Sequence, residues 1–197
     1  MLKEEITGII LSGGKSSRLG REKGLALLNG KPLIQYAIDI LKPISDRLFI
    51  SANNHLEEYA SFGYEVVEDE QKGIGPMGGL TTCLKKSNTR YNFILSCDTP
   101  FVPAEMFTYL LDSIENFQLA IPRHEDQFIE PLCAVYATNV IWQMEKSIEN
   151  RNYKLYDFIK NTNTKFVDIQ NHLPFYHEEM FVNMNTREDI QNKTENE

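Results

Sequence analysis

The chain has 197 residues, of which 42% are hydrophobic and 11% aromatic, and its formal net charge is −8 at pH 7. These values predict one globular domain over residues 1–190, followed by a polar, frayed tail over 191–197. An acidic chain is poorly suited to bind nucleic acid or an anionic membrane surface. Three cysteines without CxxC spacing support neither a disulfide framework nor a zinc site. Without an apolar leader or membrane-length segment, we expect a cytoplasmic protein.

Short apolar runs, which predict strands, alternate along the chain with segments whose apolar residues follow helical spacing. The predicted strands are 6–11, 25–28, 47–50, 64–67, 91–97, 118–121, 129–136 and 165–169. The predicted helices are 32–41, 55–60, 80–86, 103–114, 138–149, 153–159 (capped by Asn152) and a short segment after Thr186. This alternation predicts an α/β fold with three layers, in which helices cover both faces of a Rossmann-like, mostly parallel sheet.

The first predicted strand runs directly into a glycine-rich, basic loop. Gly13 and Gly14 let the backbone approach a ligand closely, because they carry no side chain. Four cations then fall within nine residues, at Lys15, Arg18, Arg21 and Lys23. Free amide groups beside Lys and Arg make a receptor for phosphate oxygens, although the spacing matches neither GxxxxGK[ST] nor GxGxxG. The alternative is a plain glycine turn with a solvated basic edge.

Polar residues follow three further predicted strands, at Ser51–Asn53, Glu68–Asp69 and Asp98. The carboxyl ends of parallel strands meet at one edge of a sheet, where open α/β folds bind their ligands. We therefore expect these residues to converge with the loop at 11–14 on one site.

Asp98 is a hard oxygen ligand, and Mg²⁺ usually takes only one or two protein carboxylates in addition to substrate phosphates. A carboxylate before Thr-Pro also starts turns, so a turn-forming role is the alternative for Asp98. Lys23 would stabilise charge on the transferring phosphate and Arg18 would bind the triphosphate, unless both are solvated surface charges. Asp69 either hydrogen-bonds a base or ribose or serves only as a turn residue.

The segment LSGGKSSRLGREKGLALLNGKPLI resembles the LxGGxSxRxGxxK…GKPL signature of the nucleotide-diphospho-sugar-type nucleotidyltransferases. Within that group the chain most resembles the molybdenum cofactor guanylyltransferase (MobA) family. CDTPFVP is similar to the family's [C/G]DxPF pattern, with Asp98 at the metal position. GIGPMGG resembles its second glycine loop, and FVNMNT resembles its NxNTPE segment with Arg187 in place of proline.

This resemblance implies a set of site residues. The nucleotide would be bound by Leu11, Ser12, Gly13, Gly14, Lys23, Ser51, Asn53, Asp69, Gly75, Pro76, Gly79 and Asp98. Catalysis would rest on Lys23, Arg18 and Asp98, with Asp98 holding the metal. Asn183 and Asn185 would contact the acceptor or the metal, and 129–132 would line the acceptor pocket.

The activity implied by the resemblance is transfer of GMP from GTP to molybdenum-molybdopterin, with Mg²⁺ (or Mn²⁺) as cofactor. Transient contact with cofactor-insertion proteins or molybdoenzymes would follow. Such chemistry needs positioning and charge neutralisation but no side-chain nucleophile. The alternatives are a CTP-dependent cytidylyltransferase acting on the same pterin, a sugar-1-phosphate nucleotidyltransferase, or a non-catalytic protein that binds and delivers a nucleotide or cofactor.

Overall fold

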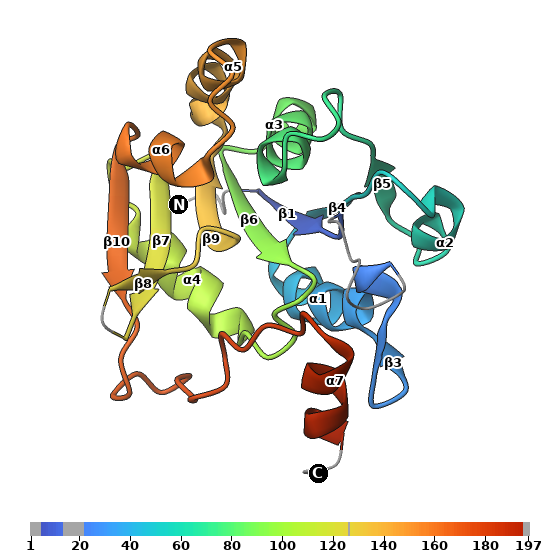
Figure 1. Ribbon diagram of the computed structural model, residues 1–197. Coiled ribbons are helices and arrows are strands. Elements are labelled where there is room, and N and C mark those ends of the chain that lie inside the picture. Colours follow the sequence, from blue (N-terminus) through green and yellow to red (C-terminus); the bar gives the residue numbers. More distant parts are fainter. Residues whose placement is uncertain (1–4, 14–21, 126, 195–197) are drawn as a thin grey trace.

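A mixed sheet of eight strands forms the centre of the protein in a computed structural model, which describes residues 5–13, 22–125 and 127–194 (Figure 1). Its strands are β1 (Ile6–Leu11), β4 (Arg47–Ser51), β5 (Glu65–Val67), β6 (Tyr91–Ser96), β7 (Leu119–His124), β8 (Phe128–Ile129), β9 (Cys133–Ala137) and β10 (Thr164–Asp168). They lie in the order β10-β7-β9-β6-β1-β4-β5, and β8 pairs with β7. The pairs β5/β4, β4/β1, β1/β6 and β7/β10 are parallel, whereas β9 is antiparallel to both β6 and β7. The predicted mostly parallel α/β sheet is therefore confirmed.

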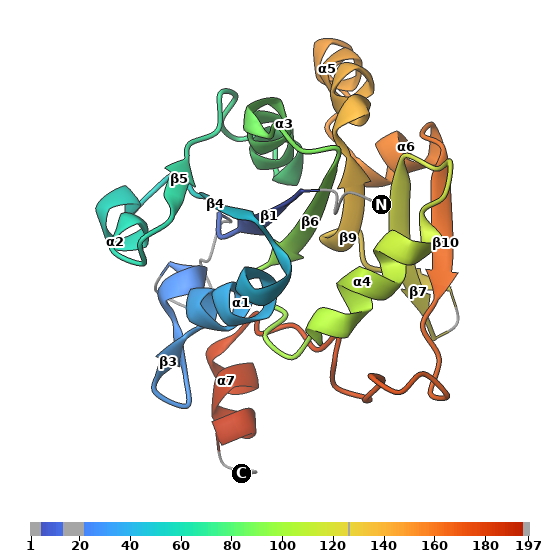
Figure 2. The ribbon, with the colours of Figure 1, turned by 180° about the vertical axis from the view of Figure 1, so that it is seen from behind.

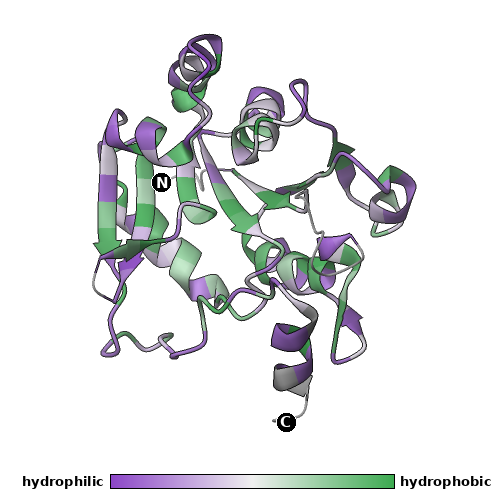
Figure 3. Cartoon of the chain, in the orientation of Figure 1, coloured by the Kyte–Doolittle hydropathy of each residue, from purple (hydrophilic) through white to green (hydrophobic). Residues whose placement is uncertain are grey.

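Helices cover both faces of this sheet, which gives three layers (Figure 2). On one face, α1 (Leu33–Leu41) and α4 (Ala104–Ser113) bury side chains against alternate strand residues such as Ile10 and Phe93. On the other face, α3 (Pro76–Lys86), α5 (Ile141–Glu149) and α6 (Leu155–Lys160) pack against Ile9 and Ile94. Successive side chains of a strand point to opposite faces, so a strand covered on both sides is expected to be mostly apolar. The central strands are accordingly hydrophobic along most of their length (Figure 3).

Three smaller elements lie at the edges of the sheet. The helix α2 (Leu56–Ala60) precedes β5, and a hairpin joins β2 (Leu27–Leu28) to β3 (Lys31–Pro32). Its turn residues Asn29 and Gly30 both have positive φ, as the sequence Asn-Gly predicts for a two-residue hairpin loop. The last helix, α7 (Arg187–Thr194), lies beside this hairpin and extends into the segment that we expected to be a frayed tail.

Several predicted boundaries were wrong. Pro32 ends β3 instead of starting a helix, and the predicted strand 129–136 is divided into β8 and β9 around Pro131, which has no N–H to donate to a ladder. Asn152 does not cap α6; its Oδ1 accepts a 3.3 Å hydrogen bond from the backbone N–H of Lys154, and the helix begins at Leu155.

The largest boundary error concerns α3, which begins at Pro76 and not at residue 80. Proline is favoured in the first turn of a helix because its missing N–H would have no intrahelical partner there. Pro76 and Gly79, which we expected in a loop, therefore belong to a helix. None of the described helices is long and apolar enough to cross a membrane.

Gly79 allows α3 to pack closely against the ends of β1, β4 and β5. A Cβ atom at this position would overlap Ser51 Oγ, lie 3.2 Å from Asp69 Oδ1 and lie 3.4 Å from Leu11 Cδ2. The helix can approach these strand ends only because residue 79 has no side chain.

We predict that Gly79→Ala lowers the free energy of unfolding by about 1–3 kcal/mol, because overpacking outweighs the gain in helix propensity of about 1 kcal/mol. Urea denaturation of the wild type, Gly79→Ala, Ser51→Ala and the double variant measures this effect. Removal of Ser51 Oγ should relieve part of the loss, which would appear as a coupling energy. A Gly79→Ala protein at least as stable as the wild type would contradict this close packing.

Candidate active site

The carboxyl ends of β1, β4 and β6 are joined by backbone hydrogen bonds that continue beyond the strands. The N–H of Ser12 donates to the carbonyl of Ser51 at 2.9 Å, and the N–H of Cys97 donates to the carbonyl of Leu11 at 3.1 Å. Ala52 likewise donates to Val67 at 3.1 Å, which adds the end of β5. The residues that follow these four strands are thereby held along one edge of the sheet.

Three of the expected site residues meet in one hydrogen-bonded group. The Nζ atom of Lys23 lies 2.5 Å from Asp98 Oδ2 and 2.6 Å from Asn185 Oδ1. The side chains of Lys23 and Asp98 are 19% and 13% exposed, so the ion pair lies at the surface but is partly shielded from water. These residues are up to 162 positions apart in the sequence, and only the fold brings them together.

The position of Asp98 is fixed by contacts on both its side chain and its backbone. The Ser96 hydroxyl donates a hydrogen bond to Asp98 Oδ1, which leaves Oδ2 directed at Lys23. The carbonyl of Asp98 accepts a hydrogen bond of 2.8 Å from the N–H of Met184. The carboxylate therefore presents one oxygen atom to the site while the segment before Asn185 is tied to the same residue.

Asn185 precedes a capping box at the start of α7. Asp189 Oδ2 accepts hydrogen bonds from the N–H groups of Asn185 and Thr186, at 2.9 and 2.7 Å, and Thr186 Oγ1 accepts one from the N–H of Asp189. Desolvation acts to raise the pKa of Asp189, but these hydrogen bonds and the charge of Lys23 hold it below its usual value. Reciprocal bonds of this kind satisfy backbone N–H groups at a helix N-terminus. This cap orients the segment that carries Asn185 without the proline that the family pattern has at position 187.

Lys23 begins a short 3-10 helix, Lys23–Leu25, that packs against Tyr59. A Cβ atom at Gly24 would lie 2.6 Å from the Tyr59 hydroxyl oxygen, so the close approach requires glycine. Burial raises the pKa of the neighbouring Glu22, opposed by the charge of His55 and by the Tyr59 hydroxyl. This packing fixes the backbone at Gly24, immediately after Lys23.

A second group of expected residues lies at the ends of β4 and β5. The N–H of Asp69 donates to Asn53 Oδ1 at 3.0 Å, and the Ser51 hydroxyl donates to Asp69 Oδ1 at 3.4 Å. Gly75 precedes α3 with a φ of 68°, and Gly79 faces both Ser51 and Asp69. The N-terminus of α3 thus adjoins a set of polar side chains, and the exposed Gly13 lies beside Asn53.

Asp98 and Asn185 have the donor set that a small divalent cation needs. Two oxygen atoms, one from a carboxylate and one from an amide, converge on a single positive group, the ammonium of Lys23. Mg²⁺ commonly takes one or two protein ligands and completes its shell with water and phosphate oxygens. The described residues contain no group of three or more His, Cys, Asp or Glu side chains placed so that they could hold a metal ion.

His124 and Glu130 form a further pair that the sequence did not suggest. His124 Nε2 lies 3.1 Å from Glu130 Oε1, and both side chains are partly buried. Burial raises the pKa of Glu130, opposed by His124, and the negative charge of Asp98 raises it further.

The remaining expected residues have other positions. Gly14 and Arg18 lie outside the described residues. The side-chain amide of Asn183 donates to the carbonyl of Phe181 at 3.2 Å and thus stabilises its own loop. Sequence reasoning also missed Ser96 and Asp189. The Thr-x-x-Asp spacing of a capping box could have indicated Asp189, whereas nothing in the local sequence indicates Ser96.

Comparisons with known proteins identify the family to which this chain belongs. A model of the MobA-like NTP transferase domain matches residues 8–165. A protein of Thermococcus kodakarensis named probable molybdenum cofactor guanylyltransferase is 32% identical over 192 residues, which cover 95% of this chain and 93% of that protein. A protein of Thermococcus gammatolerans with the same name is 34% identical over 188 residues, which cover 93% of this chain and 96% of that protein.

The fold of this chain also matches that of a solved structure. The crystal structure of molybdopterin-guanine dinucleotide biosynthesis protein A from Archaeoglobus fulgidus matches with a TM-score of 0.83 at 25% identity, over 96% of this chain and 97% of that one. The family model, the curated relatives and the solved structure each cover most of the sequence. The chain belongs to the MobA-like NTP transferase family.

Proposed function

We propose that this protein transfers GMP from GTP to molybdenum-molybdopterin, releasing pyrophosphate and forming the guanine dinucleotide form of the cofactor. The observation that carries the proposal is the group formed by Lys23, Asp98 and Asn185 at the carboxyl end of β6. The names of the curated relatives supply the nucleotide and the acceptor class.

The reaction is a displacement at phosphorus. An oxygen of the acceptor phosphate forms a bond to the α-phosphorus of GTP while the bond to the bridging oxygen of pyrophosphate breaks. The protein need not form a covalent intermediate; it must align the two substrates and neutralise the negative charge that they bring together. The ammonium of Lys23 supplies a fixed positive charge for this purpose, and in our proposal Arg18 adds another on the triphosphate.

A divalent cation belongs to this proposal, and we infer Mg²⁺, with Mn²⁺ as a substitute. When bound, it neutralises phosphate charge and orients the phosphate oxygens. Asp98 Oδ2 and Asn185 Oδ1 are the oxygen atoms that would hold it, because both already face one positive group.

The nucleotide lies, in this proposal, over the ends of β1, β4 and β5. Leu11 to Gly14 offer backbone groups to the phosphates. The segment from Gly75 to Gly79 and the strand end at Ser51–Asn53 select the base, and Asp69 hydrogen-bonds the base or the ribose. Asn183 remains a proposed contact of the acceptor. We place the activity in the cytoplasm and expect transient delivery of the product to cofactor-insertion proteins or molybdoenzymes.

The direct test supplies the purified protein with molybdenum-molybdopterin, Mg²⁺ and each nucleoside triphosphate in turn, and measures pyrophosphate and the dinucleotide product. Consumption of GTP supports the proposal, and consumption of CTP alone would replace it with cytidylyl transfer. Turnover with a sugar 1-phosphate in place of the pterin would reassign the acceptor. Binding of GTP without pyrophosphate release would indicate a delivery protein.

We predict that Asp98→Ala abolishes turnover and leaves the fold intact, because the carboxylate serves the metal and Lys23 while the backbone bond to Met184 is unchanged. Pyrophosphate release and a thermal melt measure the two effects. Asp112→Ala, which removes an exposed carboxylate from α4, is the matched control. An active Asp98→Ala enzyme with an unchanged dependence on Mg²⁺ would remove Asp98 from the metal site.

We predict that Lys23→Ala lowers kcat by about 10²-fold or more, in line with the loss of other fixed groups that stabilise developing charge. Lys31→Ala, which deletes the same charge from the exposed β2–β3 hairpin, should stay close to wild-type activity. Steady-state kinetics with each substrate varied in turn separate kcat from KM. A change confined to the KM for GTP would limit Lys23 to substrate binding.

A further inference from the structure

The five-residue helix α2 is anchored to the rest of the protein by a single side chain. Tyr59 is its only buried residue, and its side chain lies within the core cluster to which α1 contributes. A helix this short has little stability of its own, so tertiary packing must hold it in place. It follows the strand end at Ser51–Asn53 along the chain and lies at the β5 edge of the sheet (Figure 1). Tyr59 therefore fixes the position of the whole α2 segment.

The hydroxyl of Tyr59 meets the backbone that carries Lys23. A Cβ atom at Gly24 would lie 2.6 Å from the hydroxyl oxygen and 3.1 Å from Cε1 of the same ring. Gly24 is the buried residue of the 3-10 helix that begins at Lys23. The short helix thus rests directly on the polar end of the tyrosine side chain.

Three side-chain oxygen atoms around this contact are buried without a hydrogen bond of ordinary geometry to any described residue. They are Ser12 Oγ, Glu22 Oε1 and the hydroxyl oxygen of Tyr59. Most buried polar atoms in proteins are paired, so each of these needs an explanation. Burial raises the pKa of Tyr59, and interactions with the Ser12 hydroxyl and the Gly24 backbone oppose that rise. The Tyr59 hydroxyl also interacts with Glu22. The unpaired oxygen atoms are therefore neighbours around one hydroxyl group.

The hydrogen-bonding properties of the three groups are complementary. An ionised carboxylate such as that of Glu22 only accepts hydrogen bonds, whereas each hydroxyl can donate one and accept others. If Ser12 donates to Tyr59 and Tyr59 donates to Glu22, all three oxygen atoms are paired. The bond to Glu22 would be the stronger one, because its acceptor is charged.

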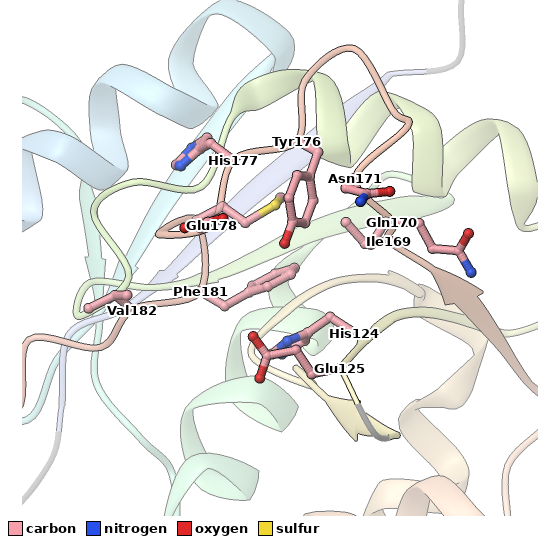
Figure 4. Close-up of a pocket in the computed structure, with 11 residues that line it drawn as sticks. His124, Glu125, Ile169, Gln170, Asn171, Tyr176, His177, Glu178, Phe181 and Val182 are labelled. Carbon is pink, nitrogen blue, oxygen red and sulfur yellow. The ribbon is translucent and has the colours of Figure 1, made fainter.

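The cavity shown in Figure 4 does not serve these groups. It has a volume of about 460 Å³ and lies at the end of β7, where residues such as His124, Tyr176 and Phe181 line it. None of the three oxygen atoms belongs to its lining, and β9, β6 and β1 separate β7 from β4 in the sheet. The partners of the buried oxygen atoms must therefore be sought among themselves and not in a ligand of that cavity.

The same three groups join two segments of the site. Ser12 directly follows β1, and Glu22 directly precedes Lys23. A common partner for both side chains limits the positions that the backbone at Lys23 can take. The ammonium group of Lys23 lies 2.5 Å from Asp98 Oδ2. A fixed charge stabilises developing charge best when it is held in position before the reaction.

We propose that Tyr59 is a positioning residue for the proposed reaction. Its hydroxyl accepts a hydrogen bond from Ser12 and donates one to Glu22, and this pairing holds the ammonium group of Lys23 at Asp98. The inference rests on the proposed function, since Lys23 is the group that acts on phosphate in that reaction. It gives α2, which lies outside the sheet, a part in catalysis through Lys23.

The first test removes the hydroxyl and keeps the ring that anchors α2. The backbone N–H groups of Leu25 and Ala26 each donate at 3.1 Å to a carbonyl at the start of the 3-10 helix. We expect Tyr59→Phe to speed hydrogen exchange at both amides about tenfold in the nucleotide-free protein, because a lost hydrogen bond favours local opening. Tyr91→Phe is the matched control: Tyr91 is buried in the same cluster but begins β6, at the other end of the sheet from Asp98. It should leave the exchange at both amides unchanged.

The second test asks whether Tyr59 acts through Lys23. We expect Tyr59→Phe to lower kcat about tenfold and to leave the KM for GTP within about twofold, as for a group that serves the transition state. In a Lys23→Ala protein the same substitution should cause no further loss of kcat, because residues that act as one unit are not additive. A purely structural role would instead lower the melting temperature and add its own loss in both backgrounds.

Glu22 provides an independent pair of variants. Glu22→Met removes the acceptor of the proposed hydrogen bond and should speed exchange at Leu25 and Ala26 as Tyr59→Phe does. Glu22→Gln keeps an acceptor oxygen and should have a clearly smaller effect.

Wild-type exchange at both amides in Tyr59→Phe and in Glu22→Met would overturn the inference. A loss of kcat that Tyr59→Phe adds in full to Lys23→Ala would also overturn it. The exchange experiment needs neither GTP nor the acceptor. If the wild type transfers no GMP, the proposed function fails, and the exchange rates alone decide whether the Tyr59 hydroxyl holds the segment of Lys23.

Discussion

The ion pair between Lys23 and Asp98 is the contact on which the site depends. It joins the segment after β1 to the segment after β6, and Asn185 adds the segment before α7 through the same ammonium group. An ion pair at a partly exposed position contributes little to stability, about 0–1 kcal/mol in most measured cases. Its value lies in holding one positive and two oxygen-bearing side chains at the place where phosphates and a cation would meet.

Two glycines allow neighbouring segments to pack closely around the site residues. Gly24 admits the Tyr59 hydroxyl behind Lys23, and Gly79 admits Ser51 and Asp69 beneath α3. In the first case the absence of a side chain lets the 3-10 helix approach α2, and in the second it lets α3 approach the strand ends. Glycine thus has the same role near Lys23 as it has near Ser51 and Asp69, because in both places it leaves room for a neighbouring side chain.

Much of the fold and part of the site could be predicted from the sequence. Apolar runs located nearly every strand of the sheet, because a strand buried on both faces consists mostly of apolar residues. Asp98, Ser51 and Asp69 could be placed at one edge because parallel strands end together. In contrast, the start of α3 was misjudged because two glycines concealed a helix that Pro76 begins. Neither the partner of His124 nor the separate contacts of Asn183 and Asn185 follow from local sequence, since each depends on segments distant in the chain.

The reversed direction of β9 has a further consequence. Strands parallel to β6 place at this edge of the sheet the residues that follow them. The antiparallel β9 instead places there the residues that precede it. The N–H of Ser96 donates to the carbonyl of Leu132 at 2.8 Å, where the end of β6 meets the start of β9. Glu130 therefore precedes its strand along the chain, whereas Asp98 follows its strand, and both lie at the same edge of the sheet. Insertions or substitutions in the β8–β9 turn can therefore change the part of the rim near Glu130 while the register of β1, β4 and β5 stays unchanged. One part of this edge of the sheet can thus vary independently of the rest.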